Sequence, residues 1–232
     1  MPSAAFAQIA ARSGLDCVVV DMEHGPIDLQ TAHSMIAATA GTQCTPLVRL
    51  PWTQHWLAKP VLDAGAYGLV FPMIGEAALA RETVRAIRYP PQGERGLAPA
   101  YASLRWGVTL PEYLRGANDA LINAIIIEHP DAITRLDEII AIEGIDLVLI
   151  ATYDLSMALG SPGQRDHPEL LRLVDEAERK LRTSGKAFGG VVFSAEDARE
   201  KISRGYQFLV VGYDVPVLQR SLTELANWVP KP

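Results

Sequence analysis

The feature that most constrains this chain is a regular alternation of short apolar runs with longer amphipathic runs. The apolar runs are rich in Val, Ile and Leu and show little polar alternation, which is typical of parallel strands covered on both faces. The predicted strands are Cys17–Asp21, Pro46–Leu50, Gly68–Met73, Asn123–Glu128, Asp146–Ile150, Phe188–Phe193 and Phe208–Gly212. The predicted helices between them are Asp28–Ala40, Gln54–Ala64, Ala77–Ile87, Pro130–Ile142, Pro168–Ser184, Ala195–Arg204 and Val217–Trp228. The alternation predicts one parallel α/β domain over residues 1–232.

The number of strands leaves two architectures open. An eight-stranded (β/α)8 barrel needs one strand more than the seven found, and this chain begins with a helical pattern, Ser3–Ser13, instead. The chain is either a TIM-type barrel without its first strand or an open, doubly wound sheet. Its length of 232 residues suits a barrel, for which about 250 residues are typical.

Charge and composition exclude several classes of function. With Lys+Arg 21, Asp+Glu 27 and a net charge of −6, nothing indicates a nucleic-acid partner, which requires clustered cations. No apolar run approaches the roughly 20 residues that cross a membrane, and the first residues do not have the pattern of a signal peptide. Cys17 and Cys44 have no metal-ligand spacing and favour a reducing compartment. We therefore expect a cytoplasmic protein.

A long connection between Arg88 and Leu121 interrupts the alternation. It contains paired prolines, two glycines and a short predicted helix, Pro111–Arg115, which Gly116 would end. Loops of this length are usually functional or disordered. Arg95 in this loop either binds a carboxylate or lies in solvent.

Two carboxylates follow neighbouring strands of the predicted sheet. Glu128 ends one strand and Asp154 comes shortly after the next, so both belong to the carboxyl edge, where α/β barrels build their active sites. Two carboxylates at one edge repel each other unless a cation lies between them. Oxygen ligands favour Mg²⁺ or Mn²⁺. The alternative is that one of them pairs with an arginine, or that Asp154 caps the next helix.

The first two strands deliver a candidate base and a candidate cation to the same edge. His24 is a candidate general base, because histidine is the side chain ordinarily suited to proton transfer near neutral pH, and Asp21 could hold its imidazole in one tautomer. Glu23 is the poorer partner for His24, because adjacent residues of an extended segment point to opposite sides. Arg49 could stabilise a developing oxyanion, or form a salt bridge to Asp21 or Glu23. The plain alternative for His24 is a surface histidine in a turn.

The ordered set of these segments resembles the class II, metal-dependent pyruvate aldolases of the HpcH/HpaI aldolase/citrate lyase family, of the 4-hydroxy-2-oxoheptanedioate aldolase type. The matching pieces are Asp21-Met22-Glu23-His24, Val48-Arg49, Val70-Phe71-Pro72-Met73, Arg88-Tyr89-Pro90-Pro91 with Arg95-Gly96, Ile127-Glu128, Asp154-Leu155-Ser156 and Val211-Gly212-Tyr213-Asp214. The resemblance implies a TIM-type barrel whose first strand, which should precede Met1-Pro2-Ser3, is missing here. It also implies a carbon–carbon lyase that joins or cleaves pyruvate, or a similar 2-oxo acid, and an aldehyde.

The resemblance also implies roles for individual residues. Glu128 and Asp154 would bind the divalent metal, Mg²⁺ or Mn²⁺ with Co²⁺ as a further option, and the metal would stabilise the pyruvate enolate. His24, oriented by Asp21, would be the base, and Arg49 would stabilise the aldehyde oxygen. The residues implied in substrate binding are Arg49, Thr152, Tyr153 and Gly212.

Members of this family are homo-oligomers, so a trimer or hexamer is expected, with the last helix (217–228) packed on a neighbouring subunit. Three residues depart from the family pattern: Ile126 replaces a Gln, and Ala151-Thr152 replaces Gly-Pro. These departures keep two alternatives open. One is a lyase of the citrate-lyase or malyl-thioester type, against which His24 with Asp21 argues. The other is a catalytically impaired barrel that binds a small acid.

Overall fold

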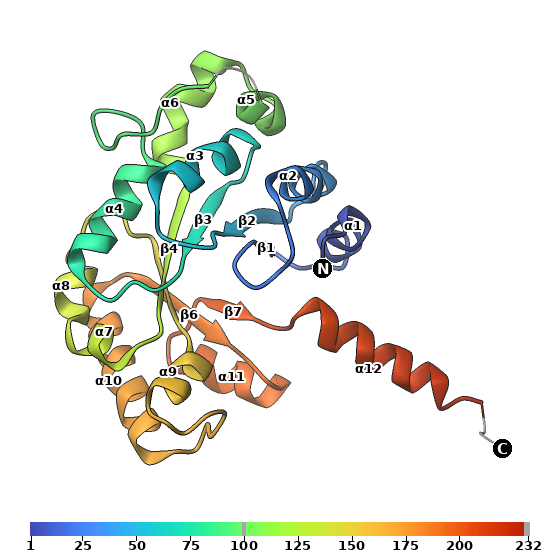
Figure 1. The fold of residues 1–232 in the computed structure, drawn as a ribbon, viewed down its shortest axis with the longest axis vertical. Helices are drawn as coiled ribbons and strands as arrows, with labels where there is room; N and C mark the ends of the chain where they lie inside the picture. The colour runs from blue at the N-terminus through green and yellow to red at the C-terminus, as the bar shows by residue number, and fades with distance from the viewer. Residues whose placement is uncertain (99–100, 230–232) are drawn as a thin grey trace.

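The protein is described by a computed structural model that places residues 1–98 and 101–229. Seven strands form one sheet in this part of the chain, in the order β1-β2-β3-β4-β5-β6-β7, and every neighbouring pair is parallel. They are β1 Cys17–Asp21, β2 Thr45–Arg49, β3 Gly68–Phe71, β4 Ile122–Ile127, β5 Leu147–Ile150, β6 Ala187–Val191 and β7 Phe208–Val210. The sheet curls into a half-barrel (Figure 1). All seven predicted strands and the barrel-like α/β class are confirmed.

The helices lie on the outside of the curled sheet (Figure 1). They are α1 Ala4–Ala11, α2 Leu29–Ala38, α3 His55–Asp63, α4 Ala77–Ile87, α5 Tyr101–Trp106, α6 Leu110–Ala120, α7 Pro130–Thr134, α8 Leu136–Ile140, α9 Thr152–Ala158, α10 Pro168–Ser184, α11 Ala195–Ser203 and α12 Asp214–Ala226. The last of them, α12, projects away from the rest of the molecule (Figure 1). None of the helices placed by the structure is both long and apolar enough to span a bilayer.

The strands are apolar on both faces because each face has its own core. On β3, Leu69 and Phe71 join a large cluster shared with the helices, whereas Val70 joins a smaller cluster inside the curl. The inner cluster consists of Leu47, Val70, Ala124, Ile126, Leu147 and Leu149. This double burial is the physical reason for the lack of polar alternation in the sequence.

Two helical predictions needed correction. The connection after Arg88 contains two helices, α5 and α6, and α6 passes through Gly116 to end at Ala120. Its start is fixed by a capping box, in which Thr109 and Glu112 satisfy each other's backbone N–H groups. The single helix expected over 130–142 is instead two short ones, α7 and α8, which meet at Arg135.

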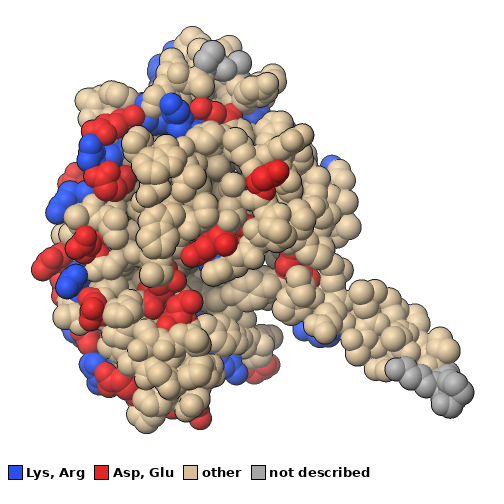
Figure 2. Space-filling model, viewed as in Figure 1, with Lys and Arg blue, Asp and Glu red and all other residues tan. Residues whose placement is uncertain are grey.

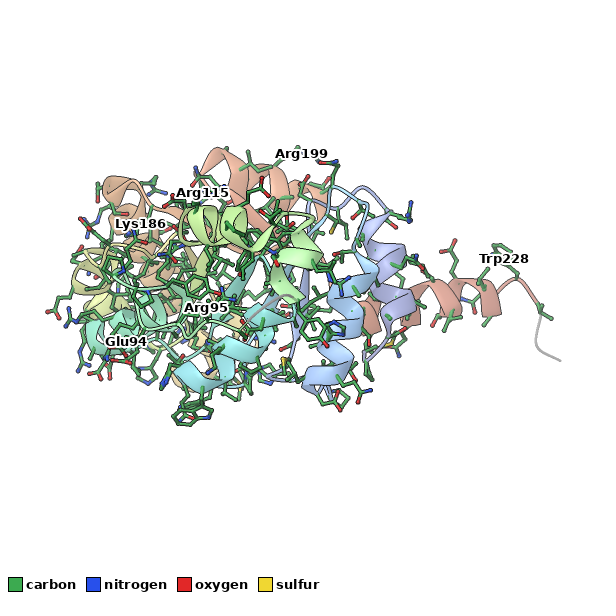
Figure 3. The ribbon with its side chains drawn as sticks, turned by 90° about the horizontal axis from the view of Figure 1, so that it is seen from above. Glu94, Arg95, Arg115, Lys186, Arg199 and Trp228 are labelled. Atoms are coloured by element: carbon green, nitrogen blue, oxygen red, sulfur yellow. The ribbon has the colours of Figure 1, made fainter. Side chains whose placement is uncertain are left out.

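Arg95 is neither a substrate ligand nor a solvated loop residue. Its side chain is 0% exposed and pairs with Asp63, with Nη2 3.0 Å from Oδ1. The guanidinium lies over the Tyr89 ring, 4.5 Å from its centroid, and donates to the Tyr113 hydroxyl. Figure 3 shows Arg95 within the body of the molecule. This arginine therefore anchors the long connection to α3.

Candidate active site

The carboxyl edge of the sheet collects the polar residues that the sequence singled out. Asp21 and Arg49 are the last residues of β1 and β2 and pair in register. Glu128 follows β4 directly, and Asp154 lies in α9 just after β5. All strands run in the same direction, so these four side chains belong to one edge. Figure 2 shows Asp and Glu side chains in the middle of the face, between the part that contains α3 and the part that contains α9.

Arg49 is held by two carboxylates of the first β–α connection. Its Nε lies 2.9 Å from Asp21 Oδ1 and its Nη2 lies 2.5 Å from Asp21 Oδ2, a bidentate arrangement. Its Nη1 lies 3.0 Å from Glu23 Oε2, an ion pair without hydrogen-bond geometry. Burial opposes the ionisation of Asp21, but the hydrogen bonds and charge of Arg49 outweigh it and keep the pKa of Asp21 below its usual value. Arg49 is thereby fixed in orientation, with its charge shared between both acids.

The structure gives His24 a different partner from the expected one. Asp21 Oδ1 accepts the backbone N–H groups of Glu23 and His24, at 3.0 and 3.3 Å, and not the imidazole. The imidazole Nε2 lies 3.6 Å from Glu23 Oε2 instead, and the His24 side chain is 68% exposed. Asp21 is occupied by Arg49 and by the turn, so orientation by Asp21 is corrected to a contact with Glu23. The pKa of Glu23 is raised by burial.

Glu128 is positioned by a strained backbone. Its carboxylate accepts the backbone N–H of Met73, a residue whose φ of 59° lies in the left-handed region that side chains other than glycine rarely adopt. Burial raises the pKa of Glu128, and the negative charges of Asp154 and Glu23 act in the same direction. A half-buried carboxylate with two like charges nearby is the situation in which a cation binds favourably.

The Asp154 side chain is exposed, and within residues 1–98 and 101–229 it forms no hydrogen bond or ion pair that would prevent it from acting as a ligand. It lies in the first turn of α9, whose N-cap is Ala151 with no side-chain capping bond, so the alternative that Asp154 caps this helix is wrong. The described residues contain no group of three or more His, Cys, Asp or Glu side chains suited to a metal. Glu128 and Asp154 together offer two oxygen donors, which fits a hard cation that takes its other ligands from water and substrate.

The remaining predicted residues border this site. Thr152 and Tyr153 open α9, and Gly212 follows β7, where a Cβ would come within 3.3 Å of the Val217 side chain. The sequence argument quoted Tyr213 within Val211-Gly212-Tyr213-Asp214 but gave it no role. Burial raises its pKa, and its charge neighbours include Arg49 and Asp154. Its place in the short connection between β7 and α12, at the carboxyl edge, was the available signal.

Comparisons with known proteins identify the family and the fold. The sequence pattern of the family described as HpcH/HpaI aldolase/citrate lyase matches residues 2–220. The chain is 37% identical to a hydroxypyruvate/pyruvate aldolase of Roseovarius nubinhibens, over 95% of this chain and 86% of the relative. It is 37% identical to a 2-keto-3-deoxy-L-rhamnonate aldolase of Escherichia coli, over 96% and 83%. The crystal structure of an HpcH/HpaI aldolase from Desulfitobacterium hafniense DCB-2 superposes with a TM-score of 0.92 at 29% identity, covering 100% of this chain and 92% of that one.

Proposed function

The chain belongs to the HpcH/HpaI aldolase/citrate lyase family and is a carbon–carbon lyase of the aldolase type, and on that premise we propose that it joins and cleaves pyruvate, or a similar 2-oxo acid, and an aldehyde. The observation that carries the proposal is that the carboxyl edge of the sheet holds two different groups of residues. Two carboxylates, Glu128 and Asp154, follow the central strands β4 and β5. Arg49, fixed at the end of β2, and His24, which follows β1, form the other group.

We propose that Glu128 and Asp154 hold the divalent cation, Mg²⁺ or Mn²⁺, with Co²⁺ as a further option. When bound, the ion supplies Lewis-acid polarisation of the 2-oxo acid carbonyl. The half-buried position of Glu128 supports this assignment, because partial burial beside other negative charges makes its own charge costly without a cation. The start of α9, with Thr152 and Tyr153, and the turn at Gly212 border the space for the substrate carboxylate.

In the direction of cleavage, His24 accepts the proton of the C4 hydroxyl of a 4-hydroxy-2-oxo acid. The C3–C4 bond breaks, its electron pair passes to C3 to give the enolate of pyruvate, and C4 leaves as the aldehyde. Glu23, 3.6 Å from His24 Nε2, stabilises the imidazolium that forms. Arg49 donates N–H groups to the C4 oxygen and stabilises the negative charge that develops on it.

The test is pyruvate release from a panel of 4-hydroxy-2-oxo acids, coupled to lactate dehydrogenase, with Mg²⁺, Mn²⁺ or EDTA. We expect metal-dependent release that is lost in Glu128→Ala. The matched control is Glu138→Ala, the same change at an exposed position of α8, which should retain activity. Absence of release from folded, metal-supplied protein, or full activity in Glu128→Ala, would contradict the proposal.

We also propose that α12 packs on a neighbouring subunit of a homo-oligomer, a trimer or hexamer. The helix has no buried residue, and it exposes Val215, Leu222 and Leu225, followed by Trp228 at 72% exposure. Trp228 lies at the far end of the projecting helix (Figure 3). Light scattering after size-exclusion chromatography should give a multiple of 25.2 kDa, reduced in Leu222→Asp. A monomer at micromolar concentration would exclude this role.

A cytoplasmic location of the protein stays a prediction from the sequence.

A further inference from the structure

Tyr213 lies in the short connection between β7 and α12, at the carboxyl edge of the sheet. β7 ends the strand order, whereas Asp21 and Arg49 end β1 and β2, the strands that begin it. The curl of the sheet brings these two ends toward each other (Figure 1). In agreement, Asp214, the residue after Tyr213, pairs with the amino group of Met1 just before α1. The connection that carries Tyr213 therefore lies beside the aldolase site, across from β1.

The charges that act on the Tyr213 hydroxyl come from both halves of that site. Burial raises the pKa of this hydroxyl, and the positive charge of Arg49 is the influence that opposes it. The negative charges of Asp154 and Asp21 act on the hydroxyl as well. Because such interactions weaken with distance, the hydroxyl lies near Arg49 and near the candidate metal ligand Asp154.

Arg49 has few N–H groups left for a substrate oxygen. Its Nε and Nη2 lie 2.9 and 2.5 Å from the carboxylate of Asp21, and its Nη1 lies 3.0 Å from Glu23 Oε2. Only the N–H groups that do not face these acids remain, and the acids neutralise part of the charge. A second donor beside Arg49 would therefore add to the stabilisation of a developing oxyanion.

The Tyr213 hydroxyl can supply this second donor. Within residues 1–98 and 101–229 it has no hydrogen-bond partner, and Tyr213 is 48% exposed, so a substrate can reach it. Its pKa is raised above the ordinary value of 10, so the hydroxyl keeps its proton at neutral pH and can donate a hydrogen bond.

Given the aldolase function proposed above, on which this role rests, we propose that Tyr213 is a further catalytic residue whose hydroxyl donates a hydrogen bond to the C4 oxygen beside Arg49. In cleavage it stabilises the negative charge that develops on this oxygen as the proton passes to His24. In the joining direction it polarises the aldehyde carbonyl. It takes no part in forming the enolate of pyruvate, which belongs to the half of the site that holds Glu128 and Asp154.

Two reactions of the whole protein with Mn²⁺ separate this role from a structural one. Cleavage of 4-hydroxy-2-oxopentanoate to pyruvate and acetaldehyde involves the C4 oxygen. Exchange of the methyl protons of pyruvate with D₂O, followed by proton NMR, involves only the enolate. In Tyr213→Phe we expect kcat for cleavage to fall about 10²-fold, the lower end of the range for loss of one oxyanion donor, because Arg49 remains. Exchange should proceed as in the wild type.

The matched control is Tyr101→Phe, the same change at an exposed position of α5, which should leave both rates unchanged. The role of Tyr213 alone is overturned if Tyr213→Phe cleaves at the wild-type rate, or if cleavage and exchange fall together. A wild type that releases no pyruvate from 4-hydroxy-2-oxo acids overturns the aldolase function itself, and the role of Tyr213 with it.

Discussion

The centre of the sheet and its two edges are supported in different ways. Every residue of β3 and β5 is buried, whereas β7 is half-buried throughout and α11 and α12, which follow β6 and β7, have no buried residue. The candidate metal ligands follow the central strands β4 and β5. The candidate base follows the edge strand β1.

This difference teaches how the two halves of the site keep their geometry. Glu128 and Asp154 follow β4 and β5, strands that are packed on both faces. Asp21 and Glu23 are instead tied to Arg49 on β2 by ion pairs across the first strand pair. Packing of the strands therefore holds the metal-ligand half in place, whereas ion pairs hold the half that contains Arg49. The predictions below test this difference between packing and charge, from the largest expected effect to the smallest.

A leucine-to-alanine substitution should lower the free energy of unfolding more at the centre of the sheet than at its edge. Leu69→Ala on β3 removes a side chain that is 0% exposed, and we expect a loss of about 2–5 kcal/mol in the free energy of unfolding. Leu209→Ala on β7 removes a partly buried side chain of the same cluster, so about 1 kcal/mol is expected. Urea unfolding at one protein concentration measures both. Equal losses would contradict the difference in packing.

Replacing Arg49 by lysine should separate charge from geometry. Arg49→Lys keeps the positive charge but loses the bidentate bonds to Asp21. We expect kcat for pyruvate release to fall about 10²–10³-fold, the range seen when an oxyanion donor is removed. Arg172→Lys, which disrupts a similar pair with Glu169 on the exposed face of α10, should leave kcat unchanged. A wild-type kcat in Arg49→Lys would show that charge alone suffices.

The carboxylates of Glu128 and Asp21 should change the free energy of unfolding in opposite directions as pH rises. The pKa of Glu128 is raised by burial, so the folded, metal-free protein binds this proton more tightly than the unfolded chain. Its stability therefore falls as pH rises from about 4.5 through the raised pKa. Asp21, whose pKa is lowered despite its burial because of Arg49, contributes stability that is lost as pH falls through its folded pKa.

Thermal melts of the metal-free protein between pH 5 and pH 8 test these signs. At the upper end, Glu128→Gln should melt a few degrees above the wild type, and Asp21→Asn a few degrees below it. The advantage of Glu128→Gln should shrink as pH falls toward the raised pKa of the wild-type carboxyl. If the melting temperatures of both variants rise, or both fall, relative to the wild type, the opposite roles of the two carboxylates are contradicted.

The smallest expected effect concerns the left-handed residue that holds Glu128. Met73→Gly removes the steric cost of φ 59° but adds chain entropy to the unfolded state. We therefore expect a gain of about 1 kcal/mol or less. The backbone N–H to Glu128 is retained, so kcat should stay within about twofold. Urea unfolding and the pyruvate assay measure the two quantities, and a marked destabilisation would show that the methionine side chain itself is required.

The sequence predicted the fold better than it predicted the contacts. The strands were found because the two cores leave a continuous apolar signal on residues such as Val70 and Ile125. The end of α6 was misplaced because Gly116 was interpreted as a helix stop, whereas the helix continues through it to Ala120. The predicted contact between Asp21 and the imidazole of His24 is not formed, because the carboxylate is taken by Arg49, 28 residues away in the sequence, and by the backbone of the turn. The left-handed conformation of Met73 leaves no mark in an apolar pattern.

The identity of chain order and sheet order has a consequence for biogenesis. Each strand pairs with the strand made just before it, so a chain growing on the ribosome can dock its strands one at a time, without waiting for a distant partner. Both carboxylates proposed as metal ligands emerge before β6 and β7 are made. A nascent chain arrested after α9 would therefore already carry these two ligands on neighbouring strands.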